Sequence, residues 1–377
     1  MADPATPPPA PPPAVPAPAV KTEAKPPTDT DAMAATRPDV LPPIDVGAWV
    51  RTGALFQGSD PSKINDFKMS SAYVELHAGG KIAKNVGVTL NLNADMADYG
   101  TAGGPLVAKV EDAIISFDPY DEFHIWAGHL LVMVDRDNSS GPFFMIPWNY
   151  PGTFDGAAIG APAEGPSGRN NGANVWGDLA GGRATYFVGA YDNGNVASSP
   201  LYSGRLRLAF LDKETGFWGN GSYFGDKDIL SIDLGAQFQK HGSAAHDMTG
   251  AITTDKDYSD LNADILFEKK IPGGGWVTGD AAYYHYGVLD GGVSDFFYVL
   301  AAYASPTAGV GNIQPSVRYQ YEKIKGGAGT NPYDLDIALA YLIKGPALRV
   351  NATYSYTKVG SASGANAIGL NAQAIFF

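Results

Sequence analysis

Hydrophobic and polar residues alternate with a period of two over most of the chain that follows residue 43. In the segment 229–240, for example, every second residue is apolar: Leu230, Ile232, Leu234, Ala236 and Phe238. Successive side chains of a β-strand point to opposite faces of the sheet, so this alternation indicates a strand with one apolar and one polar face. No segment carries a convincing helical stripe, and the sequence therefore predicts an all-β protein.

The pattern predicts sixteen strands, centred on residues 45–57, 67–80, 84–97, 108–118, 122–132, 172–180, 183–192, 201–212, 229–240, 259–270, 275–288, 295–305, 312–324, 333–343, 347–358 and 367–377. Connectors after the second, fourth, sixth and fourteenth strands are tight, whereas those after the first, third, fifth and ninth are longer and polar. Short turns at one end and long loops at the other are typical of an antiparallel barrel. The connector 213–228 breaks this rule: it is either a long excursion at the short-turn end or contains an extra hairpin in 217–224.

A soluble sandwich is the main alternative, because a period of two does not distinguish lipid from a protein core. Three features favour a transmembrane antiparallel β-barrel over residues 44–377. The strands are long, and aromatic residues cluster near strand ends, as in 283–286 and 354–356. The last strand has an apolar face and ends at the aromatic residue Phe377. Aromatic girdles of this kind mark the interfaces of membrane barrels, and closure removes the exposed edges that a large open sheet would have.

Composition excludes several classes of protein. The 377 residues include no Cys, so disulfides, thiolate metal sites and Cys nucleophiles are absent. A net charge of −13 repels nucleic acid, and no apolar run reaches the length of a transmembrane helix. The six His are scattered and no nucleotide-binding or nucleophile motif occurs, so we expect no enzyme activity, no cofactor and no metal site.

The N-terminal residues 1–43 form a separate segment, in which fourteen of residues 4–43 are Pro. Pro fixes φ and lacks an amide donor, so this segment is expected to be disordered or in a polyproline II conformation. It is either a passive tail or a periplasmic spacer that contacts the cell wall. The chain starts without a signal-peptide pattern, which we interpret as a mature form with an added Met, because a barrel must be exported to reach the outer membrane.

The longest connector, roughly 133–171, is predicted to fold into the barrel as its constriction, because its aromatic residues need a surface to pack against. The candidate constriction residues are Asp135, Arg136, Asp137, Phe143, Phe144, Trp148 and Tyr150. The candidate pore-lining residues are Glu75, Asp95, Arg205, Arg207, Asp233, Arg318, Glu322 and Arg349. The inward acids favour a mild preference for cations.

This pattern resembles the general and phosphate-selective porins of bacterial outer membranes over residues 44–377. The segment 122–131 is similar to the strand that precedes the third loop in phosphate-selective porins, but the residues that follow, 131–134, lack that family's basic residue and Pro. The resemblance implies a sixteen-stranded barrel with an inward-folded third loop, contacts with bilayer and outer-leaflet lipid, a homotrimer, and passive diffusion of small hydrophilic solutes and ions. Two alternatives remain: a substrate-selective channel for sugars or small acids, and an anchor that the Pro-rich segment ties to the cell wall.

Overall fold

The computed structural model describes residues 44–58, 66–95, 108–152, 168–192, 199–242, 245–246, 252–254, 256–287, 292–327 and 331–376, with the backbone only for 66–73, 95, 245–246 and 252–254. The Pro-rich segment 1–43, Phe377 and the side chain of Asp95 lie outside this description, so the predictions made for them stay predictions.

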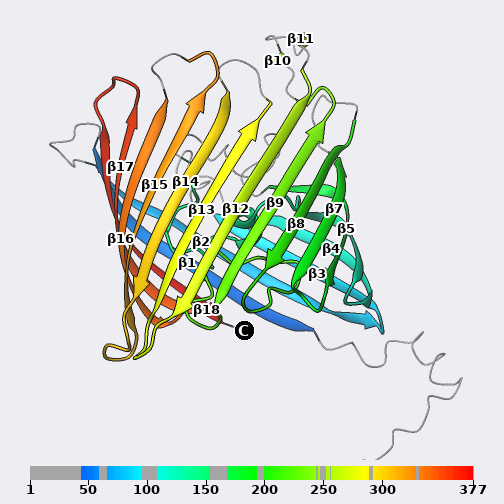
Figure 1. Cartoon of the computed structure of the whole chain (residues 1–377), viewed down its shortest axis with the longest axis horizontal. Helices are drawn as coiled ribbons and strands as arrows, with labels where there is room; N and C mark the ends of the chain where they lie inside the picture. Colours follow the sequence, from blue (N-terminus) through cyan, green and yellow to red (C-terminus); the bar gives the residue numbers. More distant parts are fainter. Residues whose placement is uncertain are drawn as a thin grey trace, which may run out of the picture. The chain divides into compact units, whose positions relative to one another are not determined.

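Sixteen long strands form one closed antiparallel barrel (Figure 1). They are β1 (Asp45–Gly58), β2 (Asp66–Ala83), β3 (Val86–Asp95), β4 (Lys109–Tyr120), β5 (Phe123–Leu131), β6 (Arg169–Leu179), β7 (Ala184–Asp192), β8 (Leu201–Ala209), β9 (Ile229–Gln239), β12 (Tyr258–Lys270), β13 (Trp276–Tyr286), β14 (Val293–Ala304), β15 (Asn312–Ile324), β16 (Pro332–Lys344), β17 (Leu348–Val359) and β18 (Ala365–Phe376). Each strand pairs with its neighbours in the chain, and β1 closes the barrel by pairing with β18. The predicted all-β barrel of sixteen strands is confirmed, and every strand overlaps its predicted segment.

Three short elements lie in the described parts of the connectors. The helix α2 (Arg136–Ser140) follows β5, and the strands β10 (Ala245–His246) and β11 (Ile252–Thr254) pair with each other between β9 and β12. Elements of this length carry no periodic signal, so the sequence did not predict them. The alternative of an extra hairpin in 217–224 is wrong, because residues 210–228 are all described and none of them forms a strand. No helix in the described part of the chain is long and apolar enough to cross a bilayer.

The two faces of the barrel wall differ in polarity. In β18, Ile368, Leu370 and Phe376 are exposed on the outer face, whereas Asn371 and Gln373 are buried on the inner face. The same division holds around the wall, where exposed apolar residues include Leu76, Leu90, Ile115, Val188, Leu234, Leu261, Val299, Leu339 and Val350. An apolar outer surface of this extent requires an apolar environment, and a closed barrel satisfies every backbone group of its strands.

Aromatic side chains gather near both rims of the outer face. Near the end with the long loops, adjacent rings on four strands have centroids 5.8–6.2 Å apart: Phe297, Tyr319, Tyr321, Tyr333 and Tyr356. Near the end with the short turns, the exposed aromatic residues include Tyr120, Phe123, Phe210, Tyr303 and Phe376. The predicted aromatic cluster 283–286 is partly wrong, because the pleat sends Tyr284 and Tyr286 into the interior, where both are buried.

Candidate functional site

The connector between β5 and β6, called L3 here (residues 132–168, described over 132–152 and at 168), folds against the inner wall of the barrel. Its first residues, from Val132 to Ser140, are all buried. Asp135 caps α2, because its Oδ1 accepts a hydrogen bond of 2.6 Å from the backbone nitrogen of Asn138. The start of L3 is therefore a packed part of the interior and not an exposed loop.

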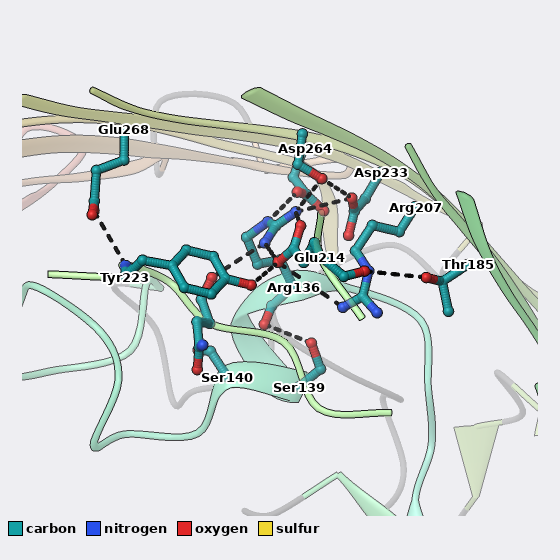
Figure 2. Close-up of polar contacts among 12 residues, drawn as sticks. Arg136, Ser139, Ser140, Thr185, Arg207, Glu214, Tyr223, Asp233, Asp264 and Glu268 are labelled. Atoms are coloured by element: carbon teal, nitrogen blue, oxygen red, sulfur yellow. Dashed lines mark hydrogen bonds and ion pairs between the residues drawn. The ribbon is translucent and has the colours of Figure 1, made fainter. Parts of the chain in front are cut away.

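Arg136 anchors L3 to one side of the wall through three carboxylates (Figure 2). Its guanidinium lies 2.6 Å from Glu214, 2.9 Å from Asp233 on β9 and 2.9 Å from Asp264 on β12. The side chain is fully buried, and burial by itself lowers the pKa of an arginine, but the three carboxylates raise the pKa of Arg136 well above its usual value. Arg136 is therefore a permanent cation that neutralises part of an acidic wall.

The partner Glu214 comes from a second inward-folded segment, the connector 210–228 between β8 and β9, at the short-turn end. Arg207 donates to the carbonyl of Gly216 at 2.6 Å, and Phe217 stacks on Trp126 of β5 with centroids 4.3 Å apart. Glu268 on β12 accepts hydrogen bonds from three groups of the connector at 2.7–3.2 Å: the Ser222 hydroxyl and the backbone nitrogens of Tyr223 and Gly225. This connector is held inside the barrel and does not extend away from it.

Glu214 joins the two inward segments. Its carboxylate accepts from Arg136 and, at 2.8 Å, from the Tyr223 hydroxyl (Figure 2). Burial raises the pKa of a carboxyl group, but Arg136 and Arg207 lower the pKa of Glu214 below its usual value, so it is ionised at neutral pH. Sequence reasoning missed this residue, although the aromatic run in 217–224 is the same signal that predicted the inward fold of L3.

The later part of L3 lies against β15, β17, β18 and β1. Arg318 donates to the carbonyl of Asn149 at 2.9 Å, and Arg349 donates to the carbonyl of Met145 at 2.6 Å. Arg51 donates to the carbonyl of Trp148, and its guanidinium lies 3.8 Å from the centre of that indole ring. These arginines hold the main chain of L3, and Arg318 also pairs with the neighbouring Asp336 at 2.6 Å.

The remaining predicted constriction residues differ in their surroundings. Asp137 accepts from the Tyr284 hydroxyl at 3.3 Å, and burial, with the nearby Asp135, raises the pKa of Asp137 to about 7. Phe143 is fully buried against Trp49, whereas Phe144 is partly exposed. Tyr150 is partly exposed, and burial raises the pKa of its hydroxyl.

The predicted wall residues other than Asp95 are buried on the inner face. Arg205 pairs with Asp233 and donates to the Ser139 hydroxyl at 2.8 Å, so it joins the same ionic network as Arg136. Glu322 is buried on β15, and Glu75 is buried on β2. That these residues line a conduction path stays a prediction.

A cavity of about 800 Å³ lies between residues 138–144 of L3, the β8–β9 connector and the wall formed by β1 to β4. Among the predicted residues, Glu75 and Phe144 line it; the other residues that the argument uses are Trp49, Glu111, Arg169 and Trp218. Arg169 lies 3.0 Å from Glu111 and 3.0 Å from Asp112. Sequence reasoning missed this acidic pair because a shift of register between β3 and β4 places two consecutive residues of β4 in the interior.

The described part of the interior is acidic. Six arginines are buried, namely Arg51, Arg136, Arg205, Arg207, Arg318 and Arg349. Fourteen acidic residues are buried, namely Glu75, Glu111, Asp112, Asp135, Asp137, Glu214, Asp233, Asp260, Asp264, Glu268, Asp280, Glu322, Asp334 and Asp336. Within the described ranges, no group of three or more His, Asp or Glu is placed to hold a metal ion.

No protein-family model and no curated protein matches the sequence. Solved structures of similar fold include OmpT of Vibrio cholerae in a trimer form (14% identity, TM-score 0.55, covering 89% of this chain and 100% of that chain). They also include an anion-selective porin from Comamonas acidovorans (13% identity, TM-score 0.59, covering 89% of this chain and 100% of that chain). A third is Salmonella typhi OmpF in complex with daunomycin (11% identity, TM-score 0.57, covering 88% of this chain and 98% of that chain). The chain therefore has the barrel fold of bacterial outer-membrane porins.

Proposed function

We propose that this chain is an outer-membrane channel for the passive diffusion of small hydrophilic solutes and ions, with a preference for cations and no catalytic activity. The observation that carries the proposal is the cavity beside L3, which lies inside a barrel with an apolar outer face and contains the carboxylates Glu75 and Glu111. Charges that line a pore favour ions of the opposite sign, and the buried acids outnumber the buried arginines in the described interior.

The test is the reversal potential of the purified protein in a planar lipid bilayer under a KCl gradient. We expect cation-selective channels, and we expect Glu75→Gln with Glu111→Gln to lower the cation-to-anion permeability ratio by about twofold or more. Glu122→Gln, which removes the same charge from an exposed turn, is the matched control. Anion selectivity or the absence of channels would contradict the proposal.

A substrate-selective channel for sugars or small acids is the second candidate. Phe144 lines the cavity together with Trp49 and Trp218, so aromatic surface is available to a solute there. Trp148, by contrast, is stacked by Arg51 and engaged in holding L3. Block of the ion current by a sugar at low concentration would favour this candidate over simple diffusion.

Location and assembly are part of the same proposal. An apolar outer face with aromatic rims suits a bilayer, and one protein of similar fold is described as a trimer form. We expect the chain to reside in the bacterial outer membrane as a homotrimer with residues 1–43 in the periplasm. Migration of the unheated protein at trimer size on a denaturing gel tests the assembly.

The Pro-rich segment offers a separate role, that of a tether to the cell wall. Deletion of residues 2–43 distinguishes the roles, because a channel retains its conductance and a tether loses its attachment to the envelope. Loss of attachment with intact conductance would make the barrel an anchor as well as a channel.

A further inference from the structure

The cavity beside L3 has the size of a ligand site. Its volume of about 800 Å³ falls within the range of pockets that enclose small organic molecules. It is bounded on one side by the strands β1 to β4 and on the other by the two inward-folded segments, L3 and the β8–β9 connector. A solute that enters it is therefore surrounded by three separate parts of the chain.

The charge of the cavity favours a cation. Three carboxylates, from Asp45, Glu75 and Glu111, line it together with one guanidinium, that of Arg169. Three negative charges and one positive charge leave a net charge of −2 with His77 neutral. Arg169 also lies 3.0 Å from Asp112, directly behind the cavity wall, which reduces its effect on a bound cation.

Aromatic rings make an organic cation a better fit than a hydrated metal ion. Trp49 and Phe144 meet edge to face, with centroids 5.5 Å apart and an interplanar angle of 79°. Trp218, from the β8–β9 connector, lines the cavity and is 39% exposed. Alkylammonium groups bind to aromatic faces through cation–π attraction and lose little hydration in doing so. The site thus combines carboxylates with aromatic surface.

We propose that this cavity binds small organic ammonium compounds. The inference rests on the proposed channel function, because the cation reaches the site through the barrel. The carboxylates of Glu75 and Glu111 balance the charge of the ligand, and Trp49, Phe144 and Trp218 contact its alkyl groups.

The test compares choline with its uncharged isostere 3,3-dimethylbutan-1-ol as blockers of the potassium current in a planar bilayer at about 0.1 M KCl, where charges are only partly screened. We expect choline to reduce the current in a saturable manner, with a half-blocking concentration about tenfold lower than that of the alcohol. Equal effects of the two compounds on conducting channels would overturn the inference and leave the proposed channel function intact.

Two variants locate the site. We expect Glu75→Gln and Trp218→Leu each to raise the half-blocking concentration of choline by about threefold to tenfold. The controls are Glu122→Gln for the charge and Phe210→Leu for the aromatic ring, since both residues are exposed and lie outside the cavity. An unchanged block in both site variants would overturn the inference.

A protein that forms no channels would contradict the proposed function, and the site is then tested by calorimetric titration of the folded, detergent-solubilised protein with choline. Saturable binding that Trp218→Leu weakens would sustain the site without the channel. Absence of binding would reject both.

Discussion

The two sides of the barrel interior are built from similar inward-facing polar residues but differ in what covers them. Beside β8, β9 and β12, the helix α2 and the β8–β9 connector lie against the wall, and Arg136 contacts Glu214, Asp233 and Asp264. Beside β1 to β4, a cavity of about 800 Å³ separates the wall from the same two segments. One side is a closed ionic network and the other is open to a solute.

This difference shows that an inward-facing charge acquires its role from the connector that reaches it. Asp233 and Glu75 have the same place in the alternation of their strands, and both were predicted to line a pore. Asp233 pairs with Arg136 and Arg205 in the network, whereas Glu75 lines the cavity. Neutralising charges on the two sides should therefore have different consequences.

The largest effect is expected for Arg136→Met. Removal of the guanidinium leaves Glu214, Asp233 and Asp264 buried without their shared cation, which costs about 3–5 kcal/mol of unfolding free energy. Thermal unfolding in detergent, followed by circular dichroism, measures the loss. Lys213→Met is the control, because Lys213 is exposed on the β8–β9 connector; equal stability of the two variants would show that the network does not stabilise the barrel.

A smaller effect, dependent on pH, is expected for Glu214→Gln. The pKa of Glu214 is lowered in the folded protein. Its carboxylate therefore contributes to the stability of the fold above the unfolded pKa of about 4.3, and this contribution is lost as the pH falls below that value. At neutral pH, the unfolding free energy of the wild type should exceed that of the variant by about 2–4 kcal/mol. A series of unfolding curves at decreasing pH measures this gap, and a gap that does not narrow in acid would contradict the assignment.

Asp137→Asn should have the opposite dependence. The pKa of Asp137 is raised to about 7, so its contribution is greatest below the unfolded pKa and is lost as the pH rises through about 7. As the pH rises from about 4 to about 7, the unfolding free energy of the variant should therefore increase by about 1–3 kcal/mol relative to that of the wild type. Above this range the difference should stay constant. Asp226→Asn, at an exposed position, should show no such trend.

The smallest effect on stability is expected on the open side. Glu75→Gln should change the unfolding free energy much less than Arg136→Met does, because the amide of Gln is close in size to the carboxylate and the residue lines an open cavity. The same variant should shift the reversal potential towards zero, whereas Arg136→Met should act mainly on stability. A large loss of stability in Glu75→Gln would mean that the two sides are not distinct.

Periodicity predicted the strands well because each inward or outward position is determined by local alternation and by the environment on its face. It was less informative where alternation is interrupted. The shift of register between β3 and β4 turns both Glu111 and Asp112 inward, and the cluster 283–286 is divided between the two faces. In both cases the face to which a side chain points depends on the strand partner of the residue as well as on its neighbours in sequence.

The sequence by itself determined the barrel, its strand count and the polarity of its faces, because these properties follow from a repeat of two residues and from the need to pair every strand edge. Only the tertiary structure decided which charges are paired and where the cavity lies. Arg136 and Glu214 are 78 positions apart, and Arg349 and Met145 are 204 apart. Contacts between irregular segments at such separations leave no periodic signal, since they depend on how two connectors fill the same enclosed space.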